Sequence, residues 1–173
     1  MKKHNLSIIG FGLMLFIASC KKNDVEHKGG LFSEPLAKAK AAAVAPEWRS
    51  FTNWTSKKAE KFTSYVSAVA DSSITSAVTR SGLVLAFAKN GTDIKALPFQ
   101  DKTGGDAYWY YQVSNGAISF SVDAYSDLST LNSAGFKYFV FTPEKLKELD
   151  SRGHSKINLM QLAYEDVVAL LKK

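Results

Sequence analysis

The side chains that most often carry out catalysis or bind metals are scarce in this chain. It has one cysteine, Cys20, and three histidines, of which His4 and His27 lie near the amino terminus. A zinc site or a nucleophile triad draws on cysteine and histidine, so one would have to be built around His154 alone. His154 lies in a predicted loop, where we expect a solvated side chain. The sequence therefore predicts no catalytic residues of these types, no metal site and no cofactor.

Carboxylates are the next candidates for chemistry. Asp101 and Asp106 flank a Lys-Thr-Gly-Gly segment, and Asp123 and Asp127 flank Ala-Tyr-Ser. Either loop offers oxygen ligands of the kind that calcium takes, but neither has the dense alternating acids of a calcium loop. The same four acids leave a hydrolase with paired carboxylates, of the glycosidase type, as an alternative. Nucleotide binding has no support, because no Gly-rich phosphate motif is present.

Aromatic side chains give the one positive signal for a ligand. In the run Tyr108-Trp109-Tyr110-Tyr111, strand alternation sends the first and third rings to one face and the second and fourth to the other. Flat exposed rings suit stacking on sugar faces. The alternative is that a helix or an edge strand covers the outward pair. The candidate ligand-binding residues of a carbohydrate-binding module are Trp109, Tyr111, Trp48 and Trp54.

The first twenty residues have the three parts of a secretory signal. A basic start at Lys2 and Lys3 precedes an apolar run from Leu6 to Ala18. That run has 13 residues, whereas a helix needs about 20 to cross a bilayer core. It ends in Ile17-Ala18-Ser19-Cys20, which resembles the lipobox of bacterial lipoproteins. The resemblance implies cleavage before Cys20, lipid on its sulfur, and a lipid-anchored location in the cell envelope, at the outer membrane.

Charge and composition limit the partners of the exported chain. Loss of Lys2 and Lys3 with residues 1–19 leaves 20 basic and 16 acidic side chains, a net charge near +4. No dense basic cluster follows, so nucleic acid is not an expected partner. Residues 20–46 have too few large apolar side chains to offset the entropy of ordering, and we expect a flexible tether there. The predicted domains are therefore a signal peptide at 1–19, a tether at 20–46 and a β-rich globular domain with C-terminal helices at 47–173.

Period-two alternation dominates after Pro46. The clearest strand is Ile118 to Val122, and Asn115-Gly116 predicts a tight hairpin that pairs it with residues 107–113. The run LVLAFA is apolar on both faces and predicts a strand covered on two sides, with a second turn at Asn90-Gly91 after it. The run FKYFVF predicts another strand that is nearly as buried. Weaker strand candidates lie at 47–55, 61–69 and 95–99.

Three segments have helical spacing. The first is one or two turns that end at Gly82. Thr142 caps the second, which has Pro143 in its first turn and runs to about residue 150. The third begins near Asn158, with Met160 on an apolar stripe that continues to Leu171 and packs on the sheet.

The order of these segments resembles that of a group of small, uncharacterised lipoproteins typical of Bacteroidota. The resemblance covers about residues 60–171, from GLVLAFAKN through YWYYQVSNGAISFSV and FKYFVF to INLMQLAYEDVVALL. It implies a β-sandwich-like domain. We expect a mainly β fold, either an antiparallel β-sandwich or a curved sheet of six or seven strands, with C-terminal α-helices packed on it.

These observations predict a non-enzymatic binding or structural module, held to a membrane through lipid on Cys20. Its expected partners are that membrane and either a glycan or another envelope protein. Two alternatives stay open at this point. One is a carbohydrate-binding module that uses exposed aromatic rings, and the other is a glycoside-type hydrolase that uses paired aspartates.

Overall fold

The structure is a computed structural model that describes residues 47–102, 106–126, 128 and 131–172. The predicted signal peptide, Cys20 and the predicted tether lie outside the described residues. The strands are β1 (Arg49–Ser50), β2 (Thr55–Lys58), β3 (Thr63–Ala70), β4 (Leu83–Asn90), β5 (Asp93–Ala96), β6 (Phe99–Asp101), β7 (Ala107–Ser114), β8 (Ala117–Ala124) and β9 (Gly135–Phe141). The helices are α1 (Ser76–Ser81), the 3₁₀ turn η1 (Leu131–Ser133), α2 (Pro143–Ser151), α3 (Lys156–Leu159) and α4 (Tyr164–Leu171).

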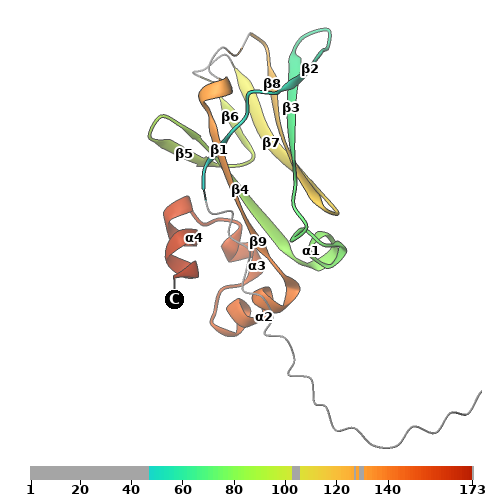
Figure 1. Ribbon diagram of the computed structural model, residues 1–173. Coiled ribbons are helices and arrows are strands. Elements are labelled where there is room, and N and C mark those ends of the chain that lie inside the picture. Colours follow the sequence, from blue (N-terminus) through green and yellow to red (C-terminus); the bar gives the residue numbers. More distant parts are fainter. Residues whose placement is uncertain (1–46, 103–105, 127, 129–130, 173) are drawn as a thin grey trace, which may run out of the picture. The chain divides into compact units, whose positions relative to one another are not determined.

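The strands form two antiparallel sheets. One has four strands in the order β1-β9-β4-β5, and the other has five in the order β2-β3-β8-β7-β6 (Figure 1). The mainly β fold with C-terminal helices is confirmed. The described residues contain nine strands rather than six or seven, because two predicted strands, at 47–55 and 95–99, each divide in two. In both places the chain passes from the four-stranded to the five-stranded sheet.

Two hairpins follow the predicted Asn-Gly turns. Gly91 joins β4 to β5 with φ of 58°, and Gly116 joins β7 to β8 with φ of 80°. Glycine adopts this left-handed region without the steric cost that a β-carbon brings. These turns set the register in which Val113 pairs with Ile118, so that both side chains point to the same face of the five-stranded sheet.

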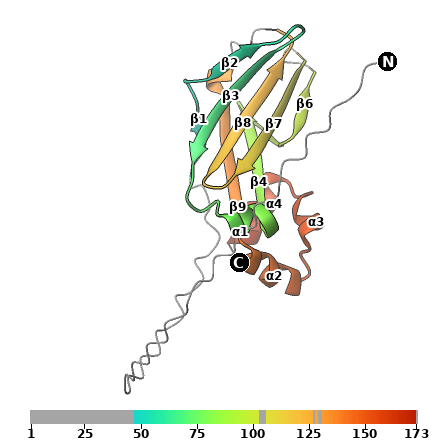
Figure 2. The same ribbon diagram turned by 90° about the vertical axis from the view of Figure 1, so that its right-hand side faces the viewer.

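The four-stranded sheet is buried on both faces, as LVLAFA and FKYFVF predicted. Val84, Phe136 and Tyr138 face the five-stranded sheet and join the core between the sheets. Phe87 and Phe139 face the other way and pack on the C-terminal helices. The helical layer contributes Leu149 from α2, Leu159 from α3, and Val167 and Leu170 from α4. Helices therefore cover the four-stranded sheet, whereas Figure 2 shows the strands of the five-stranded sheet in front with no helix over them.

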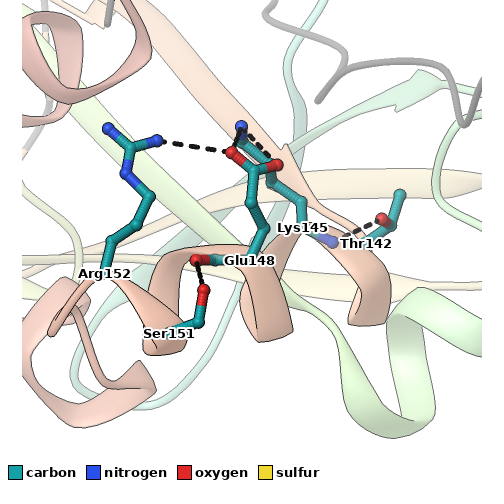
Figure 3. Close-up of polar contacts among 5 residues, drawn as sticks. All are labelled: Thr142, Lys145, Glu148, Ser151 and Arg152. Atoms are coloured by element: carbon teal, nitrogen blue, oxygen red, sulfur yellow. Dashed lines mark hydrogen bonds and ion pairs between the residues drawn. The ribbon is translucent and has the colours of Figure 1, made fainter.

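Capping residues and a glycine define the helix ends where the sequence predicted them. Thr142 Oγ1 accepts a hydrogen bond from the backbone N–H of Lys145 (3.2 Å), and Glu148 on the exposed side of α2 accepts from Lys145 (2.8 Å) and Arg152 (3.3 Å) (Figure 3). Helix α1 ends at Gly82, where a β-carbon would lie 2.6 Å from the carbonyl oxygen of Phe141. Only glycine fits this approach of α1 to the end of β9 without a shift of the backbone.

The prediction of one continuous helix from Asn158 was wrong. Ser155 caps α3 by accepting from the N–H of Asn158 (3.3 Å), and the chain turns before a separate helix α4 begins after Ala163. Met160, which was expected on the buried stripe, is 60% exposed. The stripe from Val167 to Leu170 does pack on the sheet.

Candidate ligand-binding face

The outward face of the five-stranded sheet is the surface that the fold leaves uncovered. Register places its side chains in rows across the strands. One row runs Lys57, Ser64, Asp123, Tyr108 and Gln100 from β2 to β6. The next row runs Thr55, Val66, Ser121 and Tyr110, and a third holds Ala68, Ser119 and Gln112. We call these three rows the tyrosine face.

Two tyrosine rings stand side by side on this face. Tyr108 and Tyr110 are two residues apart on β7, so both point outward, and their rings stack with centroids 5.5 Å apart and planes 25° apart. Tyr108 is 46% exposed, which is high for an aromatic side chain within a strand. Stacking orients both rings and still leaves ring surface for a ligand. Tyr125, just after β8, is 65% exposed and makes an edge contact with Phe62.

Polar side chains beside Tyr108 form hydrogen bonds with one another. Ser64 Oγ donates a hydrogen bond to Asp123 Oδ1 across the β3–β8 pair. On the other side, Gln100 Nε2 donates to Asp106 Oδ1 (2.8 Å). Each carboxylate is thereby held by a neighbour through one oxygen. The arrangement can accept hydrogen bonds from a ligand that lies against the tyrosine rings.

The candidates Trp109 and Tyr111 point the other way, and their assignment as ligand-binding rings was wrong. Trp109 is 6% exposed and stacks on Phe99 in the core between the sheets, with centroids 5.7 Å apart. Tyr111 Oη donates to the carbonyl oxygen of Val84 (2.6 Å), and burial raises the pKa of its phenol. The predicted alternation holds, but the buried pair and the exposed pair are exchanged.

Trp48 and Trp54 are also used for packing. Trp54 Nε1 donates to the carbonyl oxygen of Phe51 (3.0 Å), and its ring meets Phe51 edge-on in the core between the sheets. Trp48 packs on Tyr164 of α4 with centroids 5.2 Å apart, and Lys89 Nζ lies 5.8 Å from a Trp48 ring centroid. Neither tryptophan belongs to the tyrosine face.

The four candidate aspartates do not form one cluster. Alternation along the strands places Asp101 on the inward face of β6 and Asp123 on the outward face of β8. A catalytic pair across a cleft cannot be made from these two. Asp106 lies at the start of β7 and bonds Gln100, and Asp127 lies outside the described residues.

The remaining candidate residues from the sequence are His154 and Cys20. His154 follows α2, and its backbone N–H donates to the carbonyl oxygen of Leu149 (2.9 Å). Over the described ranges, no group of three or more histidine, cysteine, aspartate or glutamate residues is arranged to hold a metal ion. Cys20 lies outside these ranges. None of the helices in the described part of the chain is long and apolar enough to cross a membrane.

A small cavity lies between the edges of the two sheets, where β5 faces β6. Its volume is about 120 Å³, and Lys95, Phe99, Asp101 and Trp109 are among its lining residues. Ligand pockets usually enclose roughly 300 Å³ or more. Asp93 and Lys95 form an ion pair (3.2 Å) at its rim, and Lys95 Nζ lies 5.3 Å from the Phe99 ring centroid. The cavity is therefore a weaker candidate than the open tyrosine face.

A partly buried polar pair, Tyr138 and Asp71, links the two sheets. Tyr138 Oη in β9 donates to Asp71 Oδ2 after β3 (2.7 Å). Burial and this bond together raise the pKa of Tyr138 to about 12. Burial also pushes the pKa of Asp71 up, but hydrogen bonds from Tyr138 and Ser73 outweigh it, so the pKa lies below its usual value. Both shifts favour the neutral phenol and the ionised carboxylate in the folded state.

In comparisons with protein families, with curated proteins and with solved structures, nothing matches this chain.

Proposed function

We propose that this chain is an outer-membrane lipoprotein, anchored through lipid on Cys20, whose β-sandwich is a non-enzymatic module that binds a glycan. The ligand lies on the tyrosine face. The proposal includes membership of the Bacteroidota-type lipoproteins that the segment order resembles. The observation that carries it is the exposed, stacked pair Tyr108 and Tyr110 on a sheet that no helix covers.

The side chains around the tyrosines support a glycan rather than a protein partner. Stable protein interfaces have an apolar core, and the described residues of this face offer one large exposed aliphatic side chain, Val66. Its other outward neighbours are mainly small hydroxyl, amide and alanine side chains. A sugar presents hydroxyl groups along its edge and C–H groups on its face, so it suits a ring framed by hydrogen-bonding groups.

Trp48, at the start of the described chain, does not cover the tyrosine face. Trp48 packs on Tyr164 in the helical layer, which covers the four-stranded sheet on the side away from the tyrosine face. Trp48 therefore packs on the opposite side of the four-stranded sheet from the proposed ligand and leaves the tyrosine face free.

The anchor is tested with a fatty-acid probe. Cells that express the full-length chain are labelled with an alkyne fatty acid, and the wild type is compared with Cys20→Ala. We expect label on the wild type and none on the variant. Equal labelling of the two proteins would contradict the anchor.

Glycan binding is tested on an array of neutral polysaccharides and oligosaccharides. The full mature chain is purified in a detergent without a sugar headgroup, so that the detergent does not compete. We expect Tyr108→Ala to lose binding and Met160→Ala, which removes an exposed apolar side chain from the helical layer, to keep it. If the wild type binds none of the arrayed glycans, or if Tyr108→Ala binds as well as the wild type, the proposed site is wrong.

A further inference from the structure

Tyr108 has a carboxylate on each side. Across the β7–β8 pair it stands directly opposite Asp123, and across the β6–β7 pair directly opposite Gln100. Gln100 in turn holds Asp106 through the 2.8 Å hydrogen bond. The most exposed ring of the tyrosine face thus lies between one acid on β8 and another just before β7.

Both carboxylates are oriented before a ligand arrives. Ser64 bonds Oδ1 of Asp123, and Gln100 bonds Oδ1 of Asp106. Among the described residues, both of these hydrogen bonds go to Oδ1, and Oδ2 of each acid takes part in neither of them. These oxygens are acceptors only, and a hydrogen bond to an ionised acceptor is stronger than one between neutral groups. A ligand that meets them must therefore supply donors, as sugar hydroxyls do.

The acidic and basic side chains of the tyrosine face lie at different distances from Tyr108. In the row that contains Tyr108 the only cation is Lys57, which lies on β2 at the far edge of the sheet and stands opposite Ser64. Asp123 and Asp106 lie next to or near Tyr108 instead. An acidic sugar stacked on this ring would bring its carboxylate or sulfate group near two carboxylates, while Lys57, the cation of the row, lies on the far side of Ser64 and Asp123. Repulsion would disfavour such a ligand.

We infer that the tyrosine face selects neutral sugars, whose hydroxyl groups donate to Asp106 and Asp123 while one sugar ring stacks on Tyr108, and that it rejects acidic sugars. This inference rests on the proposed glycan binding and names the class of glycan. It makes Asp106 and Asp123 determinants of specificity, whereas the tyrosine rings supply the stacking surface.

Matched ligands test the inference. Neutral β-glucan and mannan oligosaccharides are titrated against the full mature chain, beside the same oligosaccharides with carboxyl groups at C6. We expect the neutral forms to bind at least about tenfold more tightly at low salt. The preference should shrink as salt rises to about 1 M, because the screening length then falls to roughly 3 Å.

A double variant, Asp106→Asn with Asp123→Asn, provides the internal control. Asparagine keeps the size of the side chain and tolerates the positive φ of 50° at residue 106. We expect the variant to bind neutral and carboxylated oligosaccharides within about threefold of each other, and its circular dichroism spectrum should match the wild type.

The outcomes separate the two proposals. Equal binding of neutral and carboxylated sugars by the wild type would overturn the inference on charge and leave glycan binding standing. Failure to bind any sugar would overturn both. Displacement of a bound neutral sugar by polylysine, with tighter binding of polylysine itself, would identify the face as a site for basic peptides and would also overturn both.

Discussion

Tyr111 and Val84 connect the two sheets through a hydrogen bond of 2.6 Å from the phenol Oη of one to the carbonyl oxygen of the other. The bond runs from β7 in the five-stranded sheet to β4 in the four-stranded sheet. The bond requires Tyr111 to point inward, and strand alternation then makes Tyr108 and Tyr110 the outward pair. The contact between the sheets and the proposed ligand face are thus opposite sides of the same strand.

Tyr111→Phe tests the contribution of this bond to stability. Removal of the hydroxyl leaves a buried carbonyl oxygen with one partner fewer, so we expect a loss of about 1–2 kcal/mol in the free energy of unfolding. Urea denaturation followed by circular dichroism measures it. Tyr108→Phe serves as the control, since its side chain is on the surface and should change stability by less than about 0.5 kcal/mol. Equal losses for the two variants would contradict the assignment of inward and outward faces.

The Tyr138–Asp71 pair predicts loss of stability at alkaline pH. The pKa of Tyr138 is about 12 in the folded chain against an ordinary value of 10.0, so its contribution is complete below pH 10 and is lost as pH rises toward 12. The difference in unfolding free energy between the wild type and Tyr138→Phe should therefore shrink from pH 9 to pH 12. Urea titrations at several pH values measure this difference, and a constant difference would refute the prediction.

The same pair predicts a loss at acid pH. Because hydrogen bonds from Tyr138 and Ser73 bring the pKa of Asp71 below its ordinary value of 3.8, the ionised form stabilises the fold above that pH, and the benefit disappears as pH falls below it. Asp71→Asn should be less stable than the wild type at pH 7, and the gap should narrow toward pH 2. A gap that widens on acidification would show that the carboxylate is not stabilised by folding.

Gly82 marks the close approach of α1 to β9. In Gly82→Ala the new β-carbon would lie 2.6 Å from Phe141 O and 2.8 Å from Val78 Cα, and both are backbone atoms. We expect a destabilisation of about 1–3 kcal/mol, as for overpacked cores. Ser81→Ala, one residue earlier on the exposed side of α1, is the control and should change the melting temperature little. A melting temperature of Gly82→Ala equal to that of the control would contradict the contact.

Much of the fold could be predicted from local pattern. The Asn-Gly turns, the doubly apolar β4 and β9, and the Thr142 cap are each set by neighbouring residues. The divided strands were not predictable in this way. The N–H of Leu97 still donates to Ala86 in the four-stranded sheet, and Pro98, which has no N–H, stands where the chain passes to the other sheet. The point at which a chain crosses from one sheet to the other depends on tertiary packing, and a short stretch of sequence does not reveal that packing.

The candidate site was predicted as a strand with two aromatic faces, but the choice of face was wrong. A better signal lies in the same strand. Ala107 and Val113 share their face with Trp109, whereas Gln112 and Ser114 share theirs with Tyr108. Apolar residues near the two ends of β7 indicate which face of the strand is buried, and polar residues near its end indicate which face is exposed to solvent. That face stays uncovered because the helices pack on the second apolar face of β4 and β9, whereas the outward side of β7 and β8 is mainly polar.

Two variants of Tyr108 distinguish the contribution of its aromatic ring to ligand binding from that of its hydroxyl group. If Tyr108 acts through stacking, Tyr108→Phe should bind a neutral oligosaccharide within about threefold of the wild type and Tyr108→Ala at least about tenfold more weakly, a loss of roughly 1.4 kcal/mol. Isothermal titration calorimetry measures both. Equal weakening in the two variants would assign the role to the hydroxyl group instead.

NMR mapping of the binding site on the full mature chain is the most direct test of glycan binding at the tyrosine face. Neutral β-glucan and mannan oligosaccharides are added to isotope-labelled protein, and the amide and ring resonances are followed. We expect shifts centred on Gln100, Tyr108, Tyr110 and Asp123, with the resonances of Tyr111 and of helices α2 to α4 little changed. Shifts centred on the helices or on the β5–β6 cavity, or the absence of any shift with every neutral sugar, would contradict it.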